Sequence, residues 1–325
     1  MLANVACVII GRNEGERLRR CLDSVVPRVE RVVYVDSGST DGSVEMAKSK
    51  GVEVIALDMR QPFTAARARN AGFGAALQSM PAGAFVQFVD GDCEVQPGWL
   101  ERAESFLREN PKTAAVCGRR RERYPERSIY NELCDMEWAI PPGPAKACGG
   151  DAMMRAAALR EVGGYRDDLI AGEEPELCVR LRAKGWGIEV LAAEMTLHDA
   201  AMTRFGQWWT RILRSGYAYA EGVYLHGAPP ERHGVQQLRS ALGWALVPPL
   251  AVGAGCLLFG PWALALALVY PLQIARLFVR AHGSARQRWI RAVFLVIGKF
   301  PETQGALRYW RLRSLRRTGP LIEYK

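Results

Sequence analysis

A run of 36 residues without a charged side chain, from Ser240 to Ala275, constrains this chain of 325 residues more than any other feature. A helix across a bilayer core of about 30 Å needs roughly 20 residues, so the run is too long for one span. Gly260-Pro261 stands in its middle and favours a turn. We expect two helices, about 242–259 and 262–279; the alternative is a buried hairpin in a soluble core.

Positive charge surrounds this run. Arg239 precedes it and Arg276 and Arg280 close it, which predicts that both ends lie in the cytoplasm. From residue 276 onward there are twelve Lys or Arg against Glu302 and Glu323, with aromatic residues between them. A basic segment can serve nucleic acid or an anionic membrane surface. No nucleic-acid-binding motif appears, so the preceding apolar run favours anionic membrane lipids as the partner.

The cysteines and the N-terminus indicate the compartment. Eight cysteines form no CxxC pair and no zinc spacing, and most stand among apolar neighbours. They are expected to be buried thiols in a reducing compartment. The first residues enter a strand pattern directly, so we expect no cleaved signal peptide.

The first 110 residues alternate strand and helix patterns. Apolar runs at 5–10, 32–35, 52–57 and 85–89 alternate with helical stretches, which predicts a parallel sheet with helices on both faces. Such sheets bind ligands at the carboxyl ends of their strands. Polar residues stand at three of these ends, namely Asn13 and Glu14, Asp36, and Asp90 and Asp92. They indicate a binding edge; the alternative is that they only cap helices and turns.

The sharpest local pattern is Phe88-Val89-Asp90-Gly91-Asp92, a DxD motif at a strand end. Hard carboxylate oxygens suit Mg²⁺ or Mn²⁺, and such an ion would neutralise the charges of a nucleotide diphosphate. A lone DxD is weak evidence because acidic turns are common. Here, however, other motifs stand in order around it.

With these motifs the chain resembles the inverting family 2 glycosyltransferases of GT-A fold, a Rossmann-like sheet, from residue 5 to about residue 215. The matching segments are Ile10-Gly-Arg-Asn-Glu14, Val35-Asp-Ser-Gly-Ser-Thr-Asp-Gly42, Ala66-Arg-Ala-Arg-Asn-Ala-Gly72, the DxD, Cys148-Gly-Gly-Asp151 with Gly163-Gly-Tyr165, and Gly172-Glu-Glu-Pro-Glu-Leu-Cys-Val-Arg-Leu181. The resemblance implies that a nucleotide-sugar is bound by Ile10, Arg12, Asn13, Glu14, Asp36, Arg67, Asn70, Asp90, Gly91, Gly150 and Asp151.

The resemblance also implies the catalytic and metal-binding residues. The family usually has Glu-Asp where this chain has Glu173-Glu174, so alignment makes Glu174 the general base and leaves Glu173 as the alternative. Both acids could instead only begin a solvated helix, where the dipole favours them. The resemblance makes His198 a metal ligand beside Asp90 and Asp92; a single histidine can equally be structural.

We therefore predict a GT-A domain at 1–230, a transmembrane hairpin at 231–282 and a basic amphipathic membrane-surface tail at 283–325. The expected reaction moves a sugar from a nucleotide-sugar to a hydroxyl of a lipid-linked acceptor, at the cytoplasmic face of the inner membrane, in envelope or exopolysaccharide assembly. One alternative is transfer to a polyprenyl phosphate, which is already ionised. The others are a nucleotidyltransferase, which would carry a glycine-rich basic loop after the first strand, and a non-catalytic membrane-anchored scaffold.

Overall fold

The computed structural model describes residues 1–81 and 83–315, in two compact units. The first, here called the sheet unit, comprises Met1–Arg127 and Cys134–Ala201. The second, the helical unit, comprises Ser128–Leu133 and the chain from Met202 onward. The predicted tail residues Arg316, Arg317 and Lys325 lie outside the described residues.

The sheet unit is built on one mixed sheet with the strand order β3-β2-β1-β4-β8-β6-β9-β5, and β7 pairs with β9. β3, β2, β1 and β4 run parallel, which confirms the four strands predicted near the N-terminus. β8 is antiparallel to both β4 and β6. The strands are β1 (Leu2–Gly11), β2 (Val29–Asp36), β3 (Glu53–Ala56), β4 (Phe85–Asp90), β5 (Cys93–Val95), β6 (Thr113–Glu122), β7 (Gly143–Pro144), β8 (Ala152–Arg155) and β9 (Gly187–His198).

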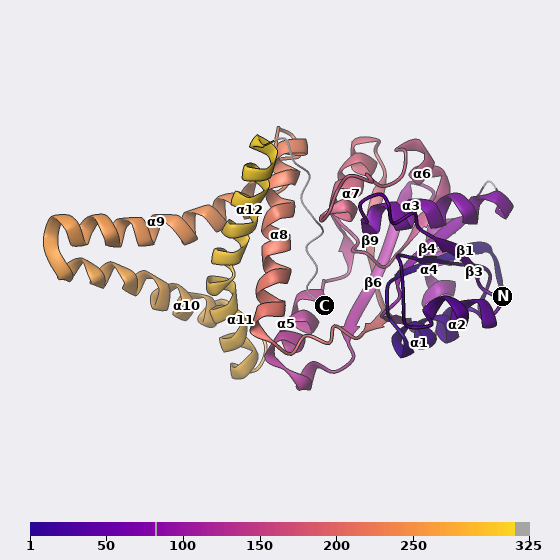
Figure 1. Cartoon of the computed structure of the whole chain (residues 1–325), viewed down its shortest axis with the longest axis horizontal. Coiled ribbons are helices and arrows are strands. Elements are labelled where there is room, and N and C mark those ends of the chain that lie inside the picture. Colours follow the sequence, from indigo (N-terminus) through magenta and orange to yellow (C-terminus); the bar gives the residue numbers. More distant parts are fainter. Residues whose placement is uncertain (82, 316–325) are drawn as a thin grey trace. The chain divides into compact units, whose positions relative to one another are not determined.

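Helices cover both faces of this sheet, with α3 on one side and α1 and α2 on the other (Figure 1). Gly72 lets α3 approach the sheet, because a Cβ there would stand 2.3 Å from the Val8 side chain. α5 (Ile129–Trp138) has residues in both units. The helices of the sheet unit are α1 (Glu16–Val25), α2 (Ser43–Ser49), α3 (Ala65–Ala76), η1 (Leu77–Ser79), α4 (Trp99–Glu109), η2 (Pro125–Arg127), α6 (Ala156–Glu161) and α7 (Glu173–Ala183).

The strand register gathers the predicted site at one edge. Ile10 pairs with Asp90 across β1 and β4, and Gly11 pairs with Asp36 across β1 and β2. β9 brings His198 opposite Cys93, next to the DxD turn. The apolar residues 188–191 lie near the start of this strand, and β9 stays paired with β6 and β5 as far as His198.

The helical unit is held by close backbone contact between α8 (Phe205–His226) and α12 (Lys299–Ser314). A Cβ on Gly216 would stand 1.9 Å from the Glu302 carbonyl oxygen, and one on Gly305 would stand 2.0 Å from that of Leu213. Only glycine permits this approach. α8 therefore groups with the C-terminal helices, in the helical unit whose main part begins at Met202.

A helical hairpin extends from the helical unit (Figure 1). Its first arm is α9 (Val235–Phe259), and its second arm is η3 (Gly260–Leu268) followed by α10 (Val269–Arg280). A hydrogen bond links the arms, in which Tyr270 OH donates to the Trp244 carbonyl at 2.9 Å. Both predicted helical arms are present, and the first begins earlier, at Val235. Among the described residues this is the one stretch long and apolar enough to cross a membrane, and its most apolar window is 11% buried. A core helix would be mostly buried.

The predicted surface tail also contains regular structure. α11 (Ala285–Ile297) begins at Ser284, whose side chain accepts the Gln287 N–H, and α12 follows directly. α12 buries Thr303, Ala306 and Tyr309. Part of the predicted tail is thus an integral part of the helical unit.

Candidate active site

The loop after β1 is fixed to the loop after β2. The Asn13 backbone N–H donates to Ser39 Oγ at 2.9 Å, and Asn13 Oδ1 accepts the Thr40 N–H at 2.7 Å. Glu14 pairs with Arg17 at 2.8 Å, while Arg12 is exposed. Two predicted donor-binding loops therefore form one surface at the strand ends.

Asp36 shapes the second of these loops. One carboxylate oxygen accepts the N–H groups of Gly38 and Ser39, both at 2.9 Å, and the other accepts Tyr34 OH at 3.0 Å. Burial raises the pKa of Tyr34, so the phenol stays a donor. Asp36 is 3% exposed and is largely satisfied by its own loop.

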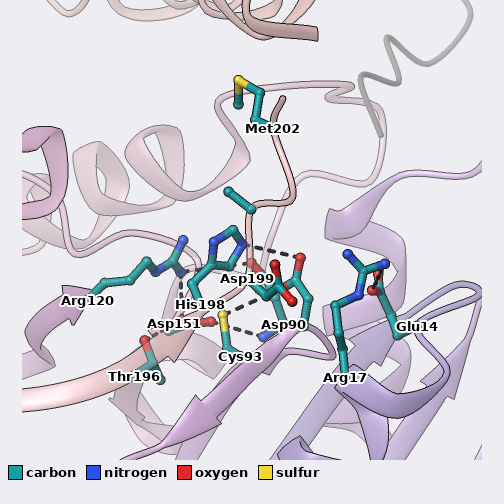
Figure 2. Close-up of polar contacts among 12 residues, drawn as sticks. Glu14, Arg17, Asp90, Cys93, Arg120, Asp151, Thr196, His198, Asp199 and Met202 are labelled. Carbon is teal, nitrogen blue, oxygen red and sulfur yellow. Dashed lines mark hydrogen bonds and ion pairs between the residues drawn. The ribbon is translucent and has the colours of Figure 1, made fainter. Parts of the chain in front are cut away.

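The DxD turn is supported from below by Asp151, which is fully buried. Asp151 Oδ1 accepts the Asp90 N–H at 2.9 Å, and Oδ2 accepts Thr196 Oγ1 at 2.8 Å (Figure 2). Gly91 N–H donates to the Ile10 carbonyl at 2.8 Å, and a Cβ on Gly91 would stand 3.1 Å from that oxygen. Asp151 thus positions the turn instead of facing a ligand, and glycine suits the close approach to β1.

His198 lies beside the second acid of the turn. Its Nε2 is 3.2 Å from Asp92 Oδ2, and its Nδ1 is 3.8 Å from Glu122 Oε2. The Trp138 ring contacts the imidazole edge-on, with centroids 4.7 Å apart. Donor atoms of Asp92, Cys93 and His198 all lie within 4.8 Å of one another. A carboxylate beside an imidazole is a typical pair of metal ligands, and a second carboxylate often supports the histidine from behind, as Glu122 does here. These residues therefore fit Mg²⁺ or Mn²⁺.

Arg69 occupies the centre of the site, and the sequence reasoning missed it. Its guanidinium donates to Asp90 Oδ1 and to Glu173 Oε1, both at 2.8 Å. Burial alone would lower the pKa of Arg69, but the charges of Asp90 and Glu173 raise it by more. The side chain therefore stays charged and links the turn to the start of α7.

Arg67, which the resemblance assigned to the nucleotide, points elsewhere. Its guanidinium donates to the backbone carbonyls of the preceding loop, at Asp58, Gln61 and Pro62. Residues two positions apart on an α-helix are rotated by about 200° about the helix axis. Arg67 and Arg69 therefore point to opposite sides of α3. The structure favours Arg69 for the role predicted at Arg67.

The two adjacent glutamates have different surroundings. Glu173 Oε1 accepts from Arg69, and its side chain is 12% exposed. Glu174 Oε1 accepts the Cys148 backbone N–H at 2.7 Å and lies 3.2 Å from Cys148 Sγ and 2.8 Å from Cys178 Sγ. Glu173 therefore belongs to the strand-end site, whereas Glu174 belongs to a separate buried pocket.

Other predicted residues support the site from behind. Asn70 donates to the Tyr165 carbonyl at 2.8 Å and accepts the Tyr165 N–H at 2.9 Å, so it holds the 163–167 turn. A Cβ on Gly150 would stand 2.7 Å from the Arg69 guanidinium, so this position must be small. Arg120, also missed, pairs with Asp151 at 2.8 Å and lies 3.9 Å from Asp90 (Figure 2). Its position in Gly118-Arg-Arg-Arg-Glu122 gave no motif to find it.

Negative charge exceeds positive charge around the turn. Five carboxylates, those of Asp90, Asp92, Asp151, Glu173 and Glu122, stand against two guanidinium groups, those of Arg69 and Arg120. A divalent cation would offset part of this excess. The arrangement suits the binding of a cation together with a phosphate-bearing ligand.

Three comparisons relate this geometry to known proteins. The model of Glycosyl transferase family 2 matches residues 6–161. Glycosyltransferase AglE of Haloferax volcanii is 33% identical over 229 residues, which cover 65% of this chain and 71% of AglE. Succinoglycan biosynthesis protein ExoA of Rhizobium meliloti is 25% identical over 281 residues, 77% of this chain and 82% of ExoA.

Among solved structures, the chain is similar to the mannosyltransferase PcManGT from Pyrobaculum calidifontis, described in complex with GDP-Man and Mn²⁺. The TM-score is 0.59 at 18% identity, over 94% of this chain and 87% of PcManGT. At that identity the likeness establishes the fold, and it agrees with the fold class predicted from the sequence.

Proposed function

The chain belongs to glycosyl transferase family 2 and has the GT-A fold, and on that premise we propose that it is a metal-dependent inverting glycosyltransferase. It would move a sugar from a nucleotide-sugar to a hydroxyl of a lipid-linked acceptor at the cytoplasmic face of the membrane. Family membership favours an enzyme over the scaffold and nucleotidyltransferase alternatives. The observation that carries the proposal is that Asp92 faces His198, while Arg69 links Asp90 of the same turn to Glu173.

The donor half of the proposal rests on the strand ends. Asp92 and His198 would hold Mg²⁺ or Mn²⁺, with Asp90 beside them. A bound ion would supply Lewis-acid stabilisation of the leaving diphosphate. The loops at Ile10–Glu14 and after Asp36 would bind the nucleoside, and Gly150 lets its loop pack closely against Arg69 and Asp90. PcManGT, a protein of the same fold, is described with such a donor and ion.

For the proton transfer we assign Glu173 in preference to Glu174. An acceptor hydroxyl loses its proton as it attacks, and a positioned carboxylate can take it. The Arg69 guanidinium links Glu173 directly to Asp90. Oε1 of Glu174, in contrast, already contacts a backbone amide and two thiols. Arg69 would hold Glu173 in place, aimed at the donor.

The pairing of Glu173 with Arg69 also favours a second candidate, transfer to a polyprenyl phosphate. The guanidinium already donates to Oε1 of Glu173 at 2.8 Å, so this oxygen is engaged before any acceptor proton is transferred. A phosphate acceptor is already negative and needs no base. The two candidates differ in how much Glu173 contributes to rate.

The acceptor half rests on the hairpin. Its exposed apolar arms support membrane attachment, and Arg239 and Arg276 at its ends support a cytoplasmic orientation. An anchored enzyme gains effective concentration from an anchored acceptor. The name of ExoA states a role in succinoglycan biosynthesis, which supports an acceptor in polysaccharide assembly.

The test is turnover by the full chain in membranes, with a panel of nucleotide-sugars and with lipid extract as the acceptor source. We expect nucleotide release and a labelled lipid product with one donor, lost in EDTA and restored by Mg²⁺ or Mn²⁺. Turnover that is unchanged in EDTA would exclude the metal-dependent mechanism. Product in the aqueous phase alone would exclude the lipid-linked acceptor.

A further inference from the structure

A second cluster of potential metal ligands lies away from the DxD turn, inside the sheet unit. It consists of Cys148, Glu174 and Cys178, all three buried, with one donor atom from each within 4.8 Å of the others. Glu174 and Cys178 are one helical turn apart on α7, and Cys148 stands on the loop before β8. Cys148 is 26 positions from Glu174 and 30 positions from Cys178 in the sequence, so no local spacing reveals the cluster.

The separations within the cluster suit tetrahedral coordination by thiolates. The two sulfur atoms are 3.8 Å apart. Two thiolates bound to one Zn²⁺ at about 2.3 Å each, at the tetrahedral angle, stand about 3.8 Å apart. Glu174 Oε1 is 3.2 Å from Cys148 Sγ and 2.8 Å from Cys178 Sγ. A small shift of the Glu174 side chain would therefore place this oxygen at the third corner of the tetrahedron.

We propose that Cys148, Cys178 and Glu174 bind a thiophilic divalent cation, Zn²⁺ in the first instance. The ion would join the loop that carries Gly150 and Asp151 to the start of α7. Because Glu173 begins that helix, the ion would fix the proposed base relative to the donor-binding loop. This site is distinct from the Mg²⁺ or Mn²⁺ site at Asp92 and His198, whose oxygen and nitrogen donors suit harder ions.

Binding exchanges protons for the ion. Zinc binds cysteine as the thiolate, so Cys148 and Cys178 each lose the thiol proton as the ion binds. Coordination releases these protons to solvent, and the Cys148 backbone N–H remains available to Glu174 as a second-shell hydrogen bond. The buried carboxylate then faces a cation in place of two neutral thiols.

The experiment measures metal content in the full chain purified in detergent. After growth with zinc and dialysis against a weak chelator, elemental analysis should find about one zinc ion per chain. Replacement by Co²⁺ should give thiolate-to-metal charge-transfer absorption. Cys178→Ser should lower the zinc content at least tenfold. Two controls should retain zinc: Cys256→Ser, which removes a thiol from the hairpin, and Asp92→Asn, which alters the DxD turn.

These readouts do not depend on turnover, so they separate this inference from the proposed function. Less than one tenth of an equivalent of zinc in the wild-type chain, with no thiolate–cobalt absorption, would overturn the site without any variant being needed. Zinc lost in Asp92→Asn and kept in Cys178→Ser would also overturn it, because the ion would then belong to the strand-end site.

Discussion

The strand-end site and the hairpin handle charge and exposure in opposite ways. At the strand ends, charged groups are buried and satisfy one another, as Arg69 does between Asp90 and Glu173. The hairpin has no charged residue between Ser240 and Ala275, yet its apolar side chains are exposed, with Leu257 at 89% and Trp262 at 87%.

The difference shows which partner each region needs. Buried charge at the strand ends is stable only while its counter-charges stay in place, because an unpaired buried charge is costly. Exposed apolar surface of this extent is costly in water and is favourable in a bilayer. Removing a charge should therefore damage the first region, and adding one should damage the second.

The largest expected effect is that of Glu173→Gln. The substitution keeps the size of the side chain and removes the charge that would accept the acceptor proton. Loss of a general base costs about 10²–10⁴-fold in rate, and we expect that fall in kcat with little change in nucleotide affinity. The measurement is kcat and the nucleotide Kd with one acceptor. A rate near wild type would favour the already ionised polyprenyl phosphate acceptor.

Glu174→Gln is the matched control, one residue further along. Its amide oxygen can take the place of Oε1 but is uncharged, so its hydrogen bonds with the Cys148 N–H and the two thiols are weaker, and we expect a lower Tm and a smaller loss of kcat. A Glu174→Gln enzyme of normal Tm that has lost turnover, beside an active Glu173→Gln, would return the base to Glu174.

The second prediction concerns Asp92→Asn. A neutral amide in place of the carboxylate facing His198 weakens the proposed ion site, and loss of one such electrostatic stabiliser typically costs about 10²–10³-fold in kcat. Tm should stay close to wild type, because the site lies on a turn. Excess Mn²⁺ should restore part of the rate. An Asp92→Asn enzyme at full rate would remove Asp92 from the metal site.

The third prediction adds a charge to the hairpin. Leu250, 69% exposed, lies near the middle of the apolar part of α9. Arginine at the centre of a spanning helix costs about 2.5–3.5 kcal/mol for insertion, so Leu250→Arg should reduce the membrane-bound fraction measurably. Leu250→Phe is the control and should remain bound. Equal fractionation of the two variants would show that this face does not meet lipid.

Much of the fold was predictable because its pattern is local. The apolar runs that became β1 to β4 are bounded by turn residues, and the charge-free run defined the hairpin arms. The length of β9 was not predictable, since its later residues are not continuously apolar and are held by pairing with β5 and β6. The grouping of α8 with α12 was equally hidden, because it depends on Gly216 and Gly305 facing each other's helices.

The site was predictable where a motif specifies backbone and side chain together, as at Asp90 and Asp92. The site was not predictable where two residues close together in the sequence are both candidates for one role. The choice between Arg67 and Arg69 depends on the rotation of α3, and that between Glu173 and Glu174 on where α7 begins. Both choices depend on tertiary contacts, about which a linear pattern carries no information. Whether these residues act as assigned stays a prediction for the variants above.

The smallest expected effect is that of salt on the wild-type chain. Basic residues of α11 and α12 attract an anionic surface by about 1 kcal/mol each, and at 1 M salt the Debye length falls to about 3 Å, which removes most of that attraction. Hydrophobic insertion of the hairpin is not screened. Some of the charges are also used internally, since Arg286 pairs with Glu132 at 3.0 Å and Lys299 with Glu302 at 2.8 Å.

The wild-type chain should therefore stay in the membrane fraction after a high-salt wash. Leu250→Arg is the informative background, because a chain with a weakened hairpin relies on its basic helices and should be released by the same wash. Release of the wild-type chain by salt alone would mean that the hairpin is not inserted, and the contrast between the two regions would then need a protein partner in place of lipid.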